Sequence, residues 1–298
     1  MTKLSTHLWF DKEAREAAKF YTSVFGSSNG SASKVKDTTT LTDTPSGSVD
    51  VVTIELAGQE FSLLSAGPLF KFNPSVSFLV ACKTKDEVDS YWEKLSKGGS
   101  ALMALGAYPF SERYGWTQDK YGLSWQVMFA GGRPIHQKIT PMLMFVGEVS
   151  GKAEEAIRFY ASVFHDSKIG DFMRHGRGEG PDKEGTVKFG PFTLDGHEFA
   201  AMDSAHPHKF KFNEAISFMV HCDTQKEIDY YWEKLSAVRA AEQCGWLKDR
   251  YGLSWQIVPT IMQSMFKEKN QKKLAKVTEA FLKMKKFDIE ALRQAYEK

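Results

Sequence analysis

Ala14-Arg-Glu-Ala-Ala-Lys-Phe-Tyr-Thr-Ser-Val-Phe25 returns later in the chain as Ala153-Glu-Glu-Ala-Ile-Arg-Phe-Tyr-Ala-Ser-Val-Phe164. In each copy, apolar residues recur at three- and four-residue spacing, which predicts an amphipathic helix. Three further segments also occur twice and in the same order: Phe70-Lys-Phe-Asn73 and Phe210-Lys-Phe-Asn213, Tyr91-Trp-Glu-Lys-Leu-Ser96 and Tyr231-Trp-Glu-Lys-Leu-Ser236, Tyr121-Gly-Leu-Ser-Trp-Gln126 and Tyr251-Gly-Leu-Ser-Trp-Gln256. The sequence is therefore a tandem duplication, and each repeat is long enough to form its own hydrophobic core.

The duplication sets the predicted domain boundaries. We expect a first domain at residues 1–132, a second at 138–260, and a helical C-terminal tail at 262–298. The chain has 298 residues, of which 42% are hydrophobic and 26% charged, and these are ordinary values for a globular protein. A formal net charge of +2 gives no field that would gather nucleic acid or an anionic membrane, so neither is expected as a partner.

The N-terminus and the cysteines indicate a compartment. No apolar run at the start resembles a secretory signal, and no stretch is long enough to cross a bilayer. The chain has 3 cysteines without metal-site spacing, Cys82, Cys222 and Cys244, and the first two lie in apolar runs typical of buried packing residues. We therefore expect a cytoplasmic protein without a disulfide framework.

Each repeat is predicted to contain two βαβββ modules. Short apolar runs predict strands at Leu4–Phe10, residues 51–56, 61–64, 76–80 and 123–127, whereas the strands near 33–38 and 102–110 are weakly marked. Thr84 and Thr224, each followed three residues later by Glu, predict capping boxes at the start of a helix. The expected fold class is α+β, with curled mixed sheets around cavities and helices at the C-terminus.

These duplicated motifs resemble the PhnB-like branch, labelled 3-demethylubiquinone-9 3-methyltransferase, of the glyoxalase/bleomycin-resistance/extradiol-dioxygenase (vicinal oxygen chelate) superfamily. The resemblance implies glyoxalase-like domains whose strands curl round a cavity. It also implies a pseudo-dimer within one chain, and pairing of two whole chains into a homodimer is left open. The activity is left open as well, because this fold carries many chemistries.

In metal-dependent members of the superfamily, strand residues hold a divalent ion. By resemblance, the first-strand ligand falls at His7 and Met142, the fifth-strand ligand near Ser75 and Ala215, and the last-strand ligand at Gln126 and Gln256. Among these, His7 alone is a good ligand, because methionine is too soft for hard cations and an amide adds no charge. We therefore predict no metal site and no cofactor, with a divalent metal held in another way as the alternative.

Strand alternation then selects the residues that face the cavities. The predicted ligand-binding residues are Trp9, Ser77, Trp116, Gln126, Met142, Ser217, Trp246 and Gln256. His7 and His221 are the candidate catalytic acids or bases, since histidine titrates near neutral pH. For each of these side chains, a structural role in packing or hydrogen bonding is the alternative.

Two other patterns in the sequence allow a functional interpretation. Asp203, His206 and His208 could hold a metal, but a solvated turn is the preferred interpretation. In the tail, Leu274, Val277 and Phe281 recur at helical spacing, and Asp288 is placed to cap a last helix. We expect this tail to dock its apolar stripe on the protein.

The functional hypothesis is metal-free binding of a small, partly aromatic or amphipathic molecule in the cavities. One alternative is a lyase, isomerase or transferase of the superfamily with an atypical metal site. A methyltransferase is a third alternative that rests on the family label alone, since no glycine-rich strand–helix loop for a nucleotide-like methyl donor is present.

Overall fold

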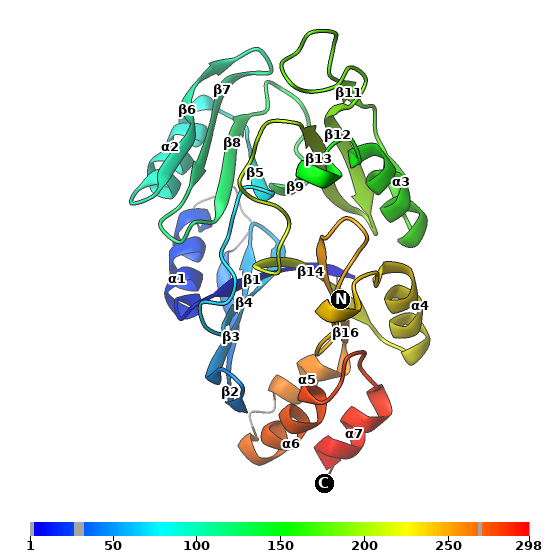
Figure 1. Ribbon diagram of the computed structural model, residues 1–298. Helices are drawn as coiled ribbons and strands as arrows, with labels where there is room; N and C mark the ends of the chain where they lie inside the picture. Colours follow the sequence, from blue (N-terminus) through cyan, green and yellow to red (C-terminus); the bar gives the residue numbers. More distant parts are fainter. Residues whose placement is uncertain (1–2, 27–32, 268–269, 298) are drawn as a thin grey trace. The chain divides into compact units, whose positions relative to one another are not determined.

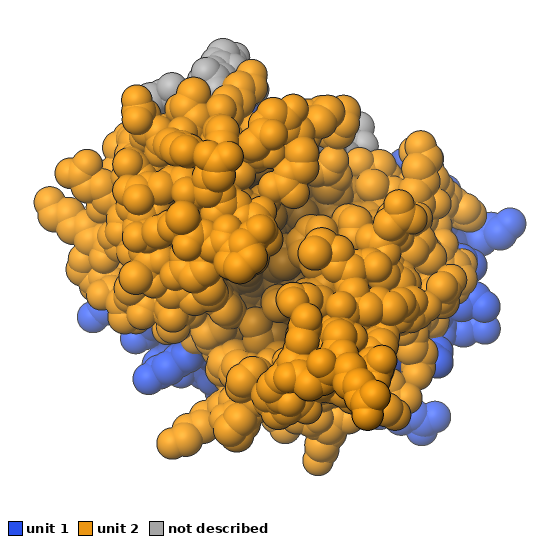
Figure 2. All heavy atoms as spheres, turned by 90° about the horizontal axis from the view of Figure 1, so that it is seen from above, with its two compact units in different colours: residues 1–71, 213–298 blue, residues 72–212 orange. Residues whose placement is uncertain are grey.

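The computed structural model describes residues 3–26, 33–267 and 270–297. It divides into two compact units, unit 1 (residues 1–71 and 213–298) and unit 2 (residues 72–212), which are coloured separately in Figure 2. Each unit is built on one curled sheet of parallel and antiparallel strands with helices against it (Figure 1). The predicted α+β class with two mixed sheets is confirmed.

Unit 1 contains two groups of elements. Its N-terminal group is β1 (Leu4–Phe10), α1 (Ala14–Phe25), β2 (Lys34–Thr44), β3 (Gly47–Leu56) and β4 (Gln59–Ser65). Its C-terminal group is β14 (Ile216–Cys222), α4 (Gln225–Leu235), β15 (Trp246–Lys248), β16 (Ser254–Pro259), α5 (Ile261–Lys267), α6 (Gln271–Leu282) and α7 (Ile289–Glu297). The strands join in the order β15-β16-β14-β1-β4-β3-β2, so the two groups share one sheet.

Unit 2 is one continuous stretch of chain. Its first half is β5 (Val76–Cys82), α2 (Lys85–Ser96), β6 (Ser100–Tyr108), β7 (Ser111–Gln118) and β8 (Ser124–Phe129). Its second half is β9 (Ile139–Val146), α3 (Ala153–Val163), β10 (Lys168–Ile169), β11 (Met173–Arg174), β12 (Val187–Leu194) and β13 (His197–Ser204). The sheet order is β10-β12-β13-β9-β5-β8-β7-β6, with β11 paired to β12.

The sheets combine modules from different repeats. In unit 1, β1 of the first repeat pairs antiparallel with β14 of the second, with His7 opposite Ser217. In unit 2, β5 of the first repeat pairs antiparallel with β9 of the second, with Ser77 opposite Met142. The first strand of a module has an unpaired backbone edge, and this pairing closes it. The compact units therefore differ from the predicted sequence domains 1–132 and 138–260, because each sheet takes one module from each repeat.

The repeated Phe-Lys-Phe-Asn motifs lie where the chain passes from one unit to the other. In unit 1, the Asn213 side chain donates a hydrogen bond to the Lys71 carbonyl (2.8 Å). In unit 2, the Asn73 side chain donates to the Lys211 carbonyl (3.1 Å). In each unit, the asparagine thus ties two segments that are far apart in the sequence.

Local predictions agree with the elements observed. The helix predicted from the opening motif is α1, and the strand predicted at Leu4–Phe10 is β1. Thr224 forms a full capping box with Glu227 at the start of α4. At α2, Thr84 accepts the Glu87 backbone N–H, but the Glu87 side chain bonds the Lys83 N–H instead of returning to Thr84. Cys82 and Cys222 are buried, as predicted.

The C-terminal tail forms α5, α6 and α7 in unit 1 (Figure 1). Its apolar side chains Phe266 and Phe281 pack on a cluster formed by Leu41, Val49 and Ala66, which confirms that the tail docks on the protein. Within the described ranges, none of the helices combines the length and apolar character needed to cross a membrane.

Candidate ligand cavity

The inner face of the unit 1 sheet is lined by alternate residues of its central strands. His7 on β1 lies opposite Ser217 on β14 and beside Ser62 on β4, so the three side chains share one face. Gln256 on β16 reaches the same place, because its side-chain N–H donates to the Ser217 hydroxyl (2.8 Å). These four residues come from four neighbouring strands. The side chains of His7, Ser62 and Gln256 form the floor of a cavity, and Ser217 is the buried partner of Gln256.

One part of this cavity, here called the aromatic compartment, encloses about 540 Å³. The rings that line it are Trp9, Phe70, Trp246, Phe266, Phe281 and Phe287, and the polar side chains include His7, Gln256 and Cys244. The Trp9 ring packs edge-on against Phe70 (5.1 Å between centroids) and lies 6.1 Å from Trp246. The Trp9 indole N–H donates to the Gly67 carbonyl (2.7 Å), which fixes the ring in the wall.

His7 is an uncharged polar group within this aromatic wall. The imidazole ring packs edge-on against Trp246 at 5.0 Å, and it is 5% exposed. Burial lowers the pKa of His7 to about 3, because the charged form loses its hydration there. Its Nδ1 atom has no hydrogen-bond partner in the described part of the chain. At neutral pH, His7 therefore offers the cavity a neutral imidazole.

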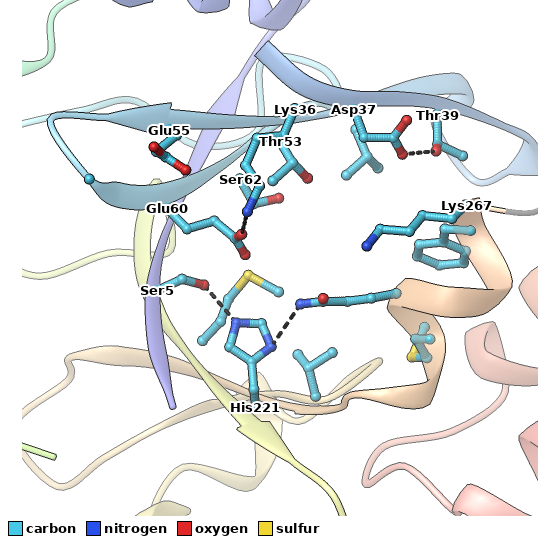
Figure 3. Close-up of a pocket in the computed structure, with 17 residues that line it drawn as sticks. Ser5, Lys36, Asp37, Thr39, Thr53, Glu55, Glu60, Ser62, His221 and Lys267 are labelled. Carbon is cyan, nitrogen blue, oxygen red and sulfur yellow. Dashed lines mark hydrogen bonds and ion pairs between the residues drawn. The ribbon is translucent and has the colours of Figure 1, made fainter. Parts of the chain in front are cut away.

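The second part of the cavity, the polar compartment, encloses about 600 Å³ and is drawn in Figure 3. His221 projects into it, with its Nε2 hydrogen-bonded to the Ser5 hydroxyl (2.8 Å) and its Nδ1 3.4 Å from the Gln263 amide. Burial lowers the pKa of His221 as well. Across the compartment, Lys36 and Glu60 form an ion pair at 2.6 Å.

The two compartments share part of their walls, namely Val51, Ser62, Met219, Val258, Met262 and Phe266. The first four of these residues lie on strands β3, β4, β14 and β16, and the last two on helix α5. Helix α5 thus contributes a wall to both compartments, and the inner face of one sheet presents a ring-lined surface and a polar surface side by side.

The corresponding inner face of unit 2 has a different composition. Gln126 donates to the Ser77 hydroxyl (2.8 Å), as Gln256 does to Ser217, but Met142 stands where unit 1 has His7. Met142 packs with Leu79 and Ala200 in an apolar cluster. The Trp116 indole donates to the Ser124 hydroxyl (2.8 Å). Figure 2 shows that this unit also has a hollowed face.

The structure thus separates the predicted site residues into two groups. In unit 1, His7, Trp9, Trp246 and Gln256 line the aromatic compartment, and His221 lines the polar compartment. Ser217 is buried behind Gln256, whose side chain it binds. Ser77, Trp116, Gln126 and Met142 lie in unit 2. The roles of all ten residues in binding or catalysis stay predictions.

The donor atoms at the cavity floor do not suit a divalent cation. The four side chains His7, Ser62, Ser217 and Gln256 include no carboxylate, and the Gln256 amide carries no charge. Hard cations need charged oxygen ligands, and borderline cations need several histidines or thiolates. Within the described residues, no group of three or more His, Cys, Asp and Glu side chains is placed to hold a metal ion.

The alternative cluster near Asp203 is also occupied by structural contacts. The Asp203 carboxylate accepts backbone N–H groups of Gly151, Ala153 and Val187 at 2.8–3.0 Å, so it holds the start of α3. His208 is hydrogen-bonded to the Ser204 hydroxyl (2.9 Å). Asp203 is thus a buried residue of β13 and not part of a solvated turn, whereas His206 lies in the exposed segment that follows the strand.

Several side chains that shape the site were not identified from the sequence. Ser5 and Gln263 orient His221, and Cys244 lines the aromatic compartment. Asp249 accepts the Trp255 indole N–H (2.9 Å) next to Gln256. The sequence contains a pattern that could have identified Asp249. Asp249 and Asp119 stand at the same position of the two repeats, two residues before the Tyr-Gly-Leu-Ser-Trp-Gln motif.

Comparisons with known proteins identify the fold. Glyoxalase I from Zea mays is 12% identical, with a TM-score of 0.51, and the match covers 90% of this chain and 97% of that one. A mutant of the same enzyme gives 13% identity, a TM-score of 0.52, and coverage of 88% and 97%. At this identity the likeness concerns the fold alone. The sheets of paired βαβββ modules thus have the fold of glyoxalase I.

Sequence matches define the branch. The family described as 3-demethylubiquinone-9 3-methyltransferase matches residues 2–128 and again residues 137–258. A PhnB protein from Bacillus cereus, described with the same activity, is 37% identical, with coverage of 42% of this chain and 98% of its own and a TM-score of 0.38. The chain belongs to this PhnB-like family and carries its domain twice. No curated protein matches the chain.

Proposed function

We propose that unit 1 binds a small, partly aromatic molecule without a metal ion. The observation that carries this proposal is the aromatic compartment, where six aromatic rings surround a neutral histidine and an amide. Pockets for small molecules are typically apolar hollows with a few placed polar groups. Edge-to-face and stacked contacts favour a planar ring as the occupant.

The polar compartment next to it favours an amphipathic ligand. Both compartments share Val51, Ser62 and Met219, so one molecule with a ring at one end and a polar group at the other can extend along the sheet. The ion pair of Lys36 with Glu60 and the His221 imidazole can then receive the polar end. This arrangement supports binding over proton transfer by His7, because an imidazole with a pKa of about 3 is a weak base at neutral pH.

A fluorescent probe tests this proposal directly. N-phenyl-1-naphthylamine, a neutral planar dye, is expected to bind and to gain fluorescence on entering the aromatic compartment. Val51 lines both compartments, and Val51→Trp should fill the space and weaken binding by about tenfold or more, which corresponds to about 1.4 kcal/mol. Fluorescence titration measures the dissociation constant, and circular dichroism checks that the variant is folded.

Thr53→Trp is the matched control. Thr53 lies two residues further along β3, lines the polar compartment and does not line the aromatic one. Its dissociation constant for the dye should stay within about twofold of the wild-type value, since a twofold change is below 0.5 kcal/mol. A wild-type protein that does not bind the dye, or a folded Val51→Trp variant that binds it unchanged, contradicts the proposal.

Metal removal should leave the site unchanged. Protein purified without chelator is expected to contain manganese, iron, nickel and zinc far below one ion per chain, and dialysis against EDTA should not change dye affinity. Elemental analysis by mass spectrometry measures the content. One ion per chain that disappears in His7→Ala or His221→Ala would instead support the enzyme alternative with an atypical metal site.

The methyl transfer named in the family description is tested in the same samples. It requires a site for a methyl donor, so binding of S-adenosylmethionine in calorimetry would support that activity. We expect no heat of binding above the dilution control.

A further inference from the structure

The two repeats differ at one position that bears on the cavity. Tyr114 in unit 2 and Cys244 in unit 1 both precede the repeated Gly-Trp pair. The Tyr114 hydroxyl donates to the Gln126 side-chain oxygen (2.7 Å), while the Gln126 N–H donates to Ser77 (2.8 Å). The amide of unit 2 is thus bonded at both ends, and its oxygen is satisfied by a phenol that belongs to the chain.

The Tyr114 ring is firmly held in this position. It is 4% exposed, and the rings of Tyr108 and Phe110 pack edge-on against it at 5.4 and 4.9 Å. Tyr114 lies within β7, opposite Met128 of β8, so its side chain reaches the inner face of the sheet beside Gln126. In unit 2, the protein itself therefore shows how a phenol is accommodated next to this amide.

Unit 1 has the matching glutamine, Gln256, but has no tyrosine at the position that corresponds to Tyr114. Gln256 donates to Ser217 in the same way, but no hydrogen bond to its side-chain oxygen is formed by any described residue. Strand β15 begins only at Trp246, and Cys244 lies in the preceding tight turn with φ +53°. A short side chain thus replaces the tyrosine, and Gln256 lines the aromatic compartment.

We propose that the aromatic compartment of unit 1 takes an uncharged phenol, whose hydroxyl donates to the Gln256 side-chain oxygen as Tyr114 donates to Gln126. This inference rests on the proposed function and specifies its ligand class. The edge of the Trp246 ring and the neutral His7 imidazole lie at the same site, and His7 replaces the apolar Met142 of unit 2. Unit 1 therefore adds one more polar contact for a substituent of the ring.

The chemistry of the amide oxygen sets the selectivity. A side-chain carbonyl accepts hydrogen bonds and cannot donate them, so the ligand must carry an O–H or N–H at this point. An acceptor left without a donor in an apolar site costs free energy, and this cost penalises ligands that fit but cannot donate. A phenol meets both requirements, since its ring contacts the aromatic wall and its hydroxyl reaches the amide.

The experiment compares three ligands of similar shape by displacement of N-phenyl-1-naphthylamine. p-Cresol has a ring and a donor, 4-methylanisole has a ring and an oxygen that cannot donate, and toluene has the ring alone. In the wild-type protein, p-cresol is expected to bind about tenfold more tightly than either of the others, as for one well-formed hydrogen bond. Gln256→Met keeps the length of the side chain and removes the acceptor, so the preference should disappear while toluene still binds.

Gln126→Met is the matched control, because it makes the same exchange in unit 2 and should leave the preference for p-cresol unchanged. If the dye binds but the three ligands compete equally in the wild-type protein, or if folded Gln256→Met keeps the preference, the phenol inference is overturned and the proposed function stands. If neither the dye nor the ligands bind, the proposed function itself fails. The wild-type comparison decides the question even where Gln256→Met does not fold.

Discussion

Replacing Asp249 by alanine is expected to lower the free energy of unfolding by about 3 kcal/mol or more, because three buried donors lose their acceptor. The Asp249 carboxyl group is 1% exposed and accepts the backbone N–H groups of Tyr251 (2.8 Å) and Leu253 (3.1 Å). It also accepts the indole N–H of Trp255 (2.9 Å), the residue before Gln256. Urea denaturation followed by tryptophan fluorescence measures the change.

The large loss of unfolding free energy should be specific to the buried hydrogen bonds of Asp249. Asp288 is an exposed aspartate that accepts one backbone N–H, that of Ala291 (2.9 Å), at the start of α7. Asp288→Ala removes a helix cap and should cost about 1 kcal/mol. The buried donors would be shown to find other partners if the free energy of unfolding fell equally in the two variants, or fell by less than about 1 kcal/mol in Asp249→Ala.

Acid is expected to destabilise the protein through His7. In the unfolded chain this histidine has a pKa of about 6.5, whereas burial lowers its pKa to about 3 in the native state. Between these values the unfolded state binds more protons, so the free energy of unfolding falls as the pH decreases. The slope reaches about 1.4 kcal/mol per pH unit below pH 6.5, and the total change between pH 6.5 and 4.5 is about 2 kcal/mol. Burial of His221 acts in the same direction.

His7→Met isolates this contribution, since methionine is the residue at the matching position of unit 2. Denaturant unfolding at several pH values should show that the variant has a slope smaller by about 1.4 kcal/mol per pH unit than the wild-type protein. His206→Gln, which changes a histidine whose side chain is 58% exposed, is the surface control. Identical slopes for the wild-type protein and His7→Met would contradict the assignment of this pH dependence to His7.

The sequence predicted the local elements and the residues of the inner sheet face well. Strand alternation is a local property, so His7, Trp9 and Gln256 could be assigned to the cavity side from their spacing. The capping residue Thr224 and the cap of the last helix at Asp288 were also predicted from neighbouring residues. In each case the determining contacts lie within a few residues of one another.

The pairing of modules could not be predicted in this way. A βαβββ module from either repeat presents the same kind of strand edge, and the choice of partner depends on contacts between residues far apart in the sequence. The division of the cavity into an aromatic and a polar compartment depends on α5 and α6, which the first repeat lacks. Local patterns carry no information about where such a tail docks.

The way the chain is threaded has a consequence for biosynthesis. Unit 1 needs residues 1–71 and residues 213–298, and all of unit 2 lies between them. At about 5–20 residues per second, a ribosome needs roughly 7–30 s to make the intervening segment. During that time β1 has no β14 to pair with, although unit 2 is already complete in sequence once residue 212 has left the ribosome. One edge of β1 therefore stays without its native partner strand until the last module has been made.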